Sequence, residues 1–303
     1  MTTLSTAVIA APPRRPRRRR PLEGLLVVPA LLLFGGFFVL PLAVVLLTSL
    51  LTGNPVANPS VGFTLRNYQR LVGDDYYLEV LWTTLRLGLL TTVAALLIGY
   101  PLAHQLARLR TTLWRTLLLM AVLSPMLTGI VVRTYAWMTL LSNQGIVNTA
   151  LQGLGLTEKP VGLMYNELGT VIALVHIYVP FMVLTLTGVI GRIDPRLEEA
   201  ARSLGAGKLR GFLEVTLPLS LPGIVAGSLL VFALSISAYV TPILMGGFEI
   251  ITLPILIYQQ ISGSSFNLGF AGALAMVLLA VSLLLVVLYS RVMARTAGGR
   301  AWR

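Results

Sequence analysis

The chain has no cysteine, only two histidines and few charged side chains, and each of these scarcities excludes a class of site. Without cysteine there can be neither a disulfide nor a thiolate metal ligand. His104 and His176 lie far apart in the sequence and form no metal-binding motif. Charged residues make up 11% of the 303 residues, whereas soluble domains carry about 25%. Since 56% of the residues are hydrophobic, we predict an integral membrane protein.

Motifs of nucleotide-binding and membrane-embedded enzymes are also missing. The chain has no GxSG motif, no HExxH motif and no GxxxxGK[ST] phosphate loop; the string from Gly205 to Lys208 lacks the required spacing and the hydroxyl residue. All eleven acidic residues fall in predicted loops or at predicted helix ends, whereas ion-coupled carriers usually place carboxylates in the membrane core. We therefore predict that the chain is not an enzyme and that it has no catalytic residue, cofactor site or metal site. An ion-coupled secondary transporter is also disfavoured.

Six charge-poor segments are long enough to cross a membrane, since one helical crossing needs about 20 residues. None of them alternates apolar and polar residues, so we predict an all-α membrane protein with six transmembrane helices. The first segment is too long for a signal peptide, whose apolar core has about 7–15 residues, and we expect a retained helix. The predicted spans are 25–51, 81–106, 115–138, 168–191, 219–243 and 268–290.

The basic residues predict how the chain is oriented. Eighteen of the 23 lysines and arginines fall in the two tails and in two of the five connections, and three fall in the other connections. Because basic connections stay in the cytoplasm, both termini and the connection 192–218 are predicted to be cytoplasmic. We expect a disordered basic tail over 1–21, which meets membrane lipid rather than nucleic acid. A six-helix transmembrane domain over 22–295 and a cytoplasmic tail over 296–303 follow it.

The cytoplasmic connection carries a short amphipathic helix. Asp194 suits an N-cap, Pro195 suits the first helical position and Gly205 suits a left-handed C-cap, which together predict a helix over 195–204. Four residues at helical spacing give this helix one apolar stripe: Leu197, Ala200, Ala201 and Leu204.

The charged residues of this helix predict which of its faces is free. Glu198 and Arg202 are four residues apart in the order that favours an ion pair. Glu199 lies nearly opposite the stripe and is available to a partner. A helix with small alanines can enter a groove on another protein. The alternative is a helix lying on lipid headgroups, which the small apolar face and the mixed charges disfavour.

The spacing within this connection matches a known coupling motif. Glu199-Ala200-Ala201 is followed after three residues by Gly205, and after nine more by Val215-x-Leu217-Pro218. This pattern resembles the loop by which the membrane subunits of bacterial binding-protein-dependent ABC importers hold their ATPase, except that the family has Ile in place of Val215. The resemblance implies a type I ABC importer permease-like fold in the bacterial inner membrane. The residues that it implies for ATPase coupling are Glu199, Ala200, Ala201, Gly205, Leu217 and Pro218.

The same resemblance implies a set of partners. An ATP-binding cassette ATPase dimer would bind and hydrolyse ATP, a second homologous permease subunit would complete the membrane domain, and a periplasmic solute-binding protein would deliver the solute.

A second segment is similar to the polyamine branch of these permeases. It contains Arg133-Thr134-Tyr135-Ala136-Trp137, followed by Leu141, Gly145 and Asn148. The resemblance implies a polyamine-like solute; the alternative is another small organic solute, such as an amino-acid derivative, an opine or a phosphonate. Candidates for the translocation path are Arg133, Tyr135, Trp137, Tyr178 and Tyr239.

Packing roles are the alternative for residues inside the predicted spans. Arg133 and Arg86 are expected to extend toward the membrane interface. His176 is expected to form a hydrogen bond between helices. Gly223 and Gly227 form a GxxxG pattern that indicates close helix packing.

Overall fold

The computed structural model describes residues 28–52, 62–109, 111–263 and 266–298. The tail predicted over 1–21 and the last five residues of the tail predicted over 296–303 lie outside the described residues. Within the described part the regular structure is helical, apart from one isolated bridge between Leu51 and Phe63. The all-α prediction is therefore confirmed for this part.

The chain divides into two compact units, residues 1–44 and 45–303. The described part of the first unit consists of α2 (Val28–Phe34), the π-helical η1 (Gly35–Val39) and the beginning of α3 (Leu40–Ser49), which continues across the boundary.

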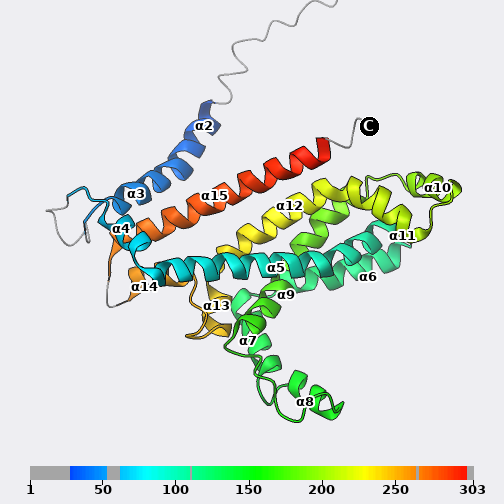
Figure 1. Cartoon of the computed structure of the whole chain (residues 1–303), viewed down its shortest axis with the longest axis horizontal. Helices are drawn as coiled ribbons and strands as arrows, with labels where there is room; N and C mark the ends of the chain where they lie inside the picture. The colour runs from blue at the N-terminus through cyan, green and yellow to red at the C-terminus, as the bar shows by residue number, and fades with distance from the viewer. Residues whose placement is uncertain (1–27, 53–61, 110, 264–265, 299–303) are drawn as a thin grey trace, which may run out of the picture. The chain divides into compact units, whose positions relative to one another are not determined.

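The second unit holds the remaining helices. They are α4 (Arg66–Gly73), α5 (Asp75–Arg108), α6 (Thr112–Leu123), η2 (Ser124–Leu127), α7 (Ile130–Leu141), α8 (Ile146–Gly153), α9 (Glu167–Ile190), α10 (Arg196–Ser203), α11 (Lys208–Gly211), η3 (Phe212–Thr216), α12 (Leu217–Ile236), α13 (Val240–Met245), α14 (Leu253–Ser262) and α15 (Leu268–Gly298). In this unit α5, α9 and α12 pack against one another, α15 packs against α12, and α10 and α11 lie at one end of the bundle (Figure 1).

Two of the long helices begin at side-chain caps that the sequence supplies. The Asp74 carboxylate accepts a hydrogen bond from the Tyr76 amide at 3.0 Å, and α5 begins there. The Asn166 side chain accepts from the Gly169 amide at 2.9 Å at the beginning of α9. Each cap satisfies one of the amides that a first helical turn leaves without a partner.

The described residues contain four helices that are long and apolar enough to cross a membrane, and up to six crossings if each of two bent pairs counts as one. The straight ones correspond to the first, second, fourth and sixth predicted spans. The third span is bent by 101° between Thr112–Leu127 and Ile130–Gly153, and the fifth by 63° between Lys208–Leu219 and Leu221–Ile236. The fifth helix also ends at Ile236, so that residues up to 243 belong to a separate turn and to α13.

Proline and glycine explain both bends. Pro125 sits in the short 3₁₀ segment η2, and Gly129 precedes α7 in an extended conformation. In the fifth span Pro222 has no amide hydrogen to donate to the carbonyl of Pro218, and the π-helical η3 precedes the bend. Hydropathy identified both segments as apolar but did not show that they are broken.

Met182 on α9 is fully buried and lies in the core of the bundle. A Cβ atom added at Gly227 on α12 would lie 2.7 Å from the Met182 sulfur, and one added at Gly99 on α5 would lie 2.9 Å from its Cγ. A Cβ at Gly223 would lie 2.9 Å from the Cβ of Val189. The close packing predicted from the Gly223–Gly227 pattern is confirmed.

Candidate functional site

The helix α10 forms at the end of the bundle with the caps that its sequence predicts. The Asp194 carboxylate accepts from the Arg196 amide at 2.9 Å, and the helix begins one residue later than expected. It ends at Ser203, and Gly205 has the expected left-handed conformation, with φ +90°. The Ala206 amide then reaches back to the Ala201 carbonyl at 3.0 Å. No atom lies within 4 Å of a Cβ added at Gly205, so the backbone conformation alone favours glycine there.

Glu198 anchors one side of α10 to the helices below it. One carboxylate oxygen accepts from the Arg108 guanidinium at the end of α5, at 3.2 Å, and from the Thr216 hydroxyl in η3. The other oxygen lies 3.7 Å from Arg202, which confirms the predicted ion pair. Arg108 also donates to the Ile193 carbonyl at 3.1 Å, just before α10. Glu198 therefore connects α10 to α5 and to the segment that leads into α12.

These contacts set the protonation of Glu198. The hydrogen bond from Thr216 lowers the pKa of the Glu198 carboxyl, and the nearby Arg108 guanidinium lowers it further, although partial burial opposes both effects. The carboxylate is therefore fully ionised at neutral pH. With 18% of the Glu198 side chain and 22% of the Arg108 side chain exposed, the pair is shielded from much of the solvent.

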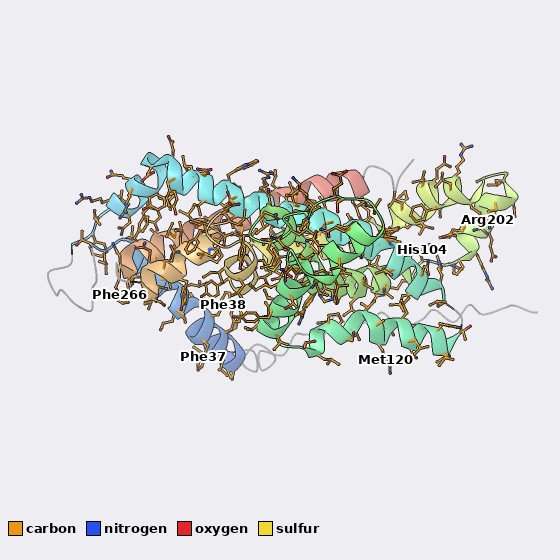
Figure 2. All side chains as sticks on the ribbon, turned by 90° about the horizontal axis from the view of Figure 1, so that it is seen from below. Phe37, Phe38, His104, Met120, Arg202 and Phe266 are labelled. Carbon is orange, nitrogen blue, oxygen red and sulfur yellow. The ribbon has the colours of Figure 1, made fainter. Side chains whose placement is uncertain are left out.

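A second set of contacts lies beneath this network. The Phe212 ring in η3 meets the rings of Tyr100 and His104 on α5 edge-on, with centroids 5.7 Å apart in each case. The Tyr100 hydroxyl lies 2.8 Å from the Ser220 hydroxyl on α12. Figure 2 shows His104 and Arg202 toward the same end of the bundle. Together these contacts fix the beginning of α12 against α5.

The other side of α10 is uncovered. Leu204 is 90% exposed and Leu209 on α11 is 72% exposed, and Leu197 and Leu213 are also exposed. Glu199 is exposed and forms no ion pair within the described part of the chain. Among the described residues, the predicted apolar stripe is therefore exposed except at Ala201. Exposed leucines around a rigid helix are typical of a surface that binds another protein.

The remaining predicted coupling residues occupy different positions. Ala200 is exposed and Ala201 half-buried on α10. Leu217 and Pro218 form the first turn of α12, where a proline needs no amide hydrogen. They lie beside η3 and are half-buried, and their coupling role stays a prediction.

The five candidates for the translocation path do not form one group. Trp137 on α7 contacts the His176 ring on α9, with centroids 5.3 Å apart, and the Tyr178 hydroxyl donates to the Leu234 carbonyl at 3.1 Å. Tyr135 is exposed elsewhere on α7. Tyr239 stands next to Tyr258, with ring centroids 4.7 Å apart. These contacts are compatible with packing, and the path assignment stays a prediction.

Two arginines within the predicted spans have partners in the chain, and the expectation that they extend to the membrane interface stays a prediction. Arg133 donates to the Thr128 carbonyl at 2.5 Å, a carbonyl exposed by the break between η2 and α7. Arg86 on α5 pairs with Glu167 at the beginning of α9, at 2.8 Å. The expected hydrogen bond of His176 is absent at Nδ1, which has no partner among the described residues.

Sequence reasoning missed Arg108, Thr216, Phe212 and the pair of Arg86 with Glu167. The sequence indicates Arg108 only as one of the basic residues that orient the chain, and it lies 90 residues from Glu198. No local sequence signal indicates the role of Thr216, which lies in a segment of mixed apolar and charged residues before the fifth span.

Comparisons with known proteins agree with this architecture. The family described as "Binding-protein-dependent transport system inner membrane component" matches residues 7–297. The spermidine/putrescine transport system permease protein PotB of Escherichia coli is 40% identical over 211 residues, which cover 70% of this chain and 76% of PotB. The protein of the same name from Haemophilus influenzae is 35% identical over 256 residues, which cover 84% of this chain and 88% of that protein.

Among solved structures, the fold matches a chain of a bacterial alginate ABC transporter in complex with an alginate pentasaccharide-bound periplasmic protein. The TM-score is 0.74 at 18% sequence identity, and the match covers 92% of this chain and 96% of the other. At that identity the likeness concerns the fold.

Proposed function

The chain belongs to the family of binding-protein-dependent transport system inner membrane components. From that premise we propose that it is the permease subunit of an ATP-driven importer, and that this importer moves a small organic cation. It is a multi-pass inner membrane protein and a transport subunit, not an enzyme. The observation that carries the proposal is α10, a capped helix fixed by Glu198 on one side and uncovered on the other.

The uncovered side of α10 suits a groove on an ATPase subunit. Eight residues are too few for a stable isolated helix, so the anchor through Glu198 and the cap at Gly205 preorganise it for binding. The exposed leucines supply apolar area, and Glu199 supplies one unpaired negative charge. The motif resemblance implies an arginine of the ATPase opposite Glu199.

The complete importer would contain an ATPase dimer, a second permease and a periplasmic solute-binding protein. The alginate transporter of similar fold was solved in complex with a periplasmic protein that holds an alginate pentasaccharide. This chain contains no phosphate loop, so ATP would bind to the partner subunits.

Similarity to two spermidine/putrescine permeases and a negative charge on the outer segments support a polyamine-like solute. The segments predicted to face the periplasm carry six acidic and three basic residues, a balance of −3. Arg86 neutralises Glu167 and reduces the balance to −2. A negative entrance raises the local concentration of cations. The fold itself leaves the sign of the solute open, since the structural neighbour takes part in the import of an acidic polysaccharide.

The test is reconstitution of the chain with the ATPase, second permease and binding protein encoded beside it. ATP-dependent uptake of labelled putrescine and spermidine into proteoliposomes is expected, with a phosphonate and a sugar as comparison solutes. Uptake of only an anion would overturn the solute while leaving the permease role in place. Failure of the chain to co-purify with any ATPase would overturn the permease role.

A further inference from the structure

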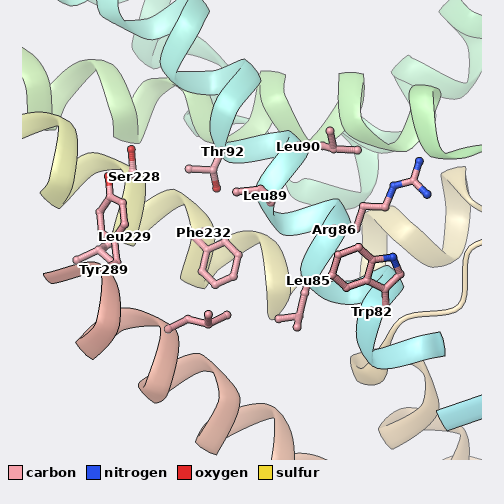
Figure 3. Close-up of a pocket in the computed structure, with 11 residues that line it drawn as sticks. Trp82, Leu85, Arg86, Leu89, Leu90, Thr92, Ser228, Leu229, Phe232 and Tyr289 are labelled. Atoms are coloured by element: carbon pink, nitrogen blue, oxygen red, sulfur yellow. The ribbon is translucent and has the colours of Figure 1, made fainter. Parts of the chain in front are cut away.

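An apolar cavity of about 460 Å³ lies between α5, α12 and α15, away from α10 (Figure 3). The apolar side chains around it include Trp82, Leu85, Leu89, Leu229, Phe232 and Leu285. The few polar lining groups besides Arg86 are Thr92, Ser228 and Tyr289. Such a lining suits a hydrocarbon chain and offers little to a polar solute.

A second apolar hollow, of about 330 Å³, lies between α5 and α9. Its lining includes Val93, Leu97 and Val171, and Leu90 lines both hollows. The two hollows are therefore neighbours that meet at Leu90.

One ion pair connects the two hollows. Arg86 lines the first, Glu167 lines the second, and 2.8 Å separates the guanidinium Nη2 from the carboxylate Oε2. In Figure 3 the guanidinium of Arg86 extends away from the cavity, on the side of Leu90. The Arg86 side chain is 55% exposed. Within the described part of the chain the other Glu167 oxygen, Oε1, has no hydrogen-bond partner.

The depth of the first cavity matches one leaflet of a bilayer. Its lining on α5 runs from Trp82 to Thr92, ten steps along the helix, which corresponds to about 15 Å at 1.5 Å per residue. That length is half of the ~30 Å hydrocarbon core. Trp82 is exposed at the end that carries Arg86, as tryptophans at a membrane interface are. In the orientation predicted from the basic residues this end faces the outer leaflet.

We propose that the two hollows hold the acyl chains of one phospholipid with a zwitterionic, amine-bearing headgroup. Its phosphate accepts from the free edge of the Arg86 guanidinium, and its ammonium lies beside the Glu167 carboxylate. The ion pair has no net charge, and this matches a headgroup that has none. A headgroup with net negative charge would meet the Glu167 carboxylate without a compensating cation. Two hollows on either side of one pair match a molecule with two chains and one headgroup.

Native mass spectrometry of the full chain, purified with its partners and titrated with phosphatidylethanolamine and phosphatidylglycerol, tests the proposal. The wild type is expected to retain one phosphatidylethanolamine. Arg86→Gln and Glu167→Gln should each reduce this retention about tenfold, the change expected when a charge-assisted hydrogen bond is lost. Leu89→Trp should reduce it by filling the first hollow. The matched controls on α6 are Arg115→Gln and Leu117→Trp, which line neither hollow.

Three results would overturn the proposal: no retained lipid, equal retention of the two lipids, or equal losses in the controls. A second measurement covers variants that fail to fold. Trp82 is kept as the sole tryptophan by changing Trp114, Trp137 and Trp302 to Phe. Brominated phosphatidylethanolamine should then quench its fluorescence more strongly than brominated phosphatidylglycerol at the same mole fraction. Equal quenching would overturn the headgroup assignment, and no quenching by either lipid would show that protein covers the cavity.

Discussion

Replacing Glu198 with glutamine should loosen α10 without changing the face that it exposes. Glutamine keeps the shape and one acceptor oxygen but removes the charge. Hydrogen bonds to charged groups contribute about 1.5–3 kcal/mol and neutral ones about 0.5–1.5 kcal/mol, and the bonds from Arg108 and Thr216 both weaken accordingly. Arg202 is 48% exposed, and its pair adds only a few tenths of a kcal/mol. The total loss is ~2 kcal/mol, about a 30-fold rise in the fraction of molecules with α10 detached.

The assay combines amide hydrogen exchange of residues 196–206 with solute uptake and ATP hydrolysis in the reconstituted importer. Glu198→Gln should exchange faster and transport less solute for each ATP hydrolysed, because a detached α10 cannot move α5 and α12. Glu199→Gln is the matched control. Its carboxylate is exposed and unpaired within the described residues, so exchange in α10 should stay at the wild-type rate. Equal exchange rates in the two variants would refute the anchoring role.

The same residue predicts a pH dependence. Because the folded state lowers the pKa of Glu198 below its ordinary value of 4.5, its stabilising effect is complete above that value. The effect is lost as the pH falls through the lower folded pKa. Relative to the intrinsic exchange rate at each pH, the protection of wild-type α10 should therefore fall only in this acidic window, and Glu198→Gln should remove that step. A wild-type step above pH 4.5 would contradict the assignment to Glu198.

Three further substitutions test other parts of the structure. Gly205→Val should weaken ATPase association in a pull-down, because a β-branched residue at φ +90° costs about 1–3 kcal/mol. Gly207→Val is the control, since Gly207 has an ordinary φ of −67°. If both variants bound the ATPase equally well, the cap at Gly205 would not matter for docking. Glu199→Arg should abolish uptake at normal membrane abundance, by placing like charges together in a partly desolvated groove, and normal uptake would remove the docking assignment. Gly223→Ala should lower the Tm, since overpacking against Val189 costs about 1–3 kcal/mol. Gly188→Ala on α9, where a Cβ meets nothing within 4 Å, should hold or raise the Tm, and the reverse order would contradict the packing.

Local chemistry explains what the sequence predicted well. The ends of α10 follow from Asp194 and Gly205, whose side chain and backbone freedom act within a few residues. The pair of Glu198 with Arg202 follows from helical spacing. Apolar runs located all six candidate crossings, because the length of a run is a property of the sequence alone.

Tertiary contacts explain what the sequence did not predict. Arg108 and Glu198 are 90 residues apart, and Phe212 and Tyr100 come from different helices. Contacts between such distant residues produce no periodic pattern in the sequence. The bend of the third crossing depends on how α7 packs after Gly129, with Arg133 holding the Thr128 carbonyl. Proline and glycine marked these sites, but their presence alone does not give an angle.

The shared use of one carboxylate restricts how α10 can move. Glu198 contacts Arg108, the last residue of the 34-residue α5, and Thr216, the residue before α12. The edge-on contacts of Phe212 join the same two segments a second time. A displacement of α10 by a bound ATPase must therefore carry α5 and the beginning of α12 together or break the Glu198 contacts. Since α5 extends about 51 Å at 1.5 Å per residue, a rotation imposed at α10 reaches the opposite side of the membrane through one continuous helix. The fifth crossing is instead bent by 63° between Leu219 and Leu221, which interrupts the transmission of a rotation along it. We therefore expect α5 to carry the larger part of the motion.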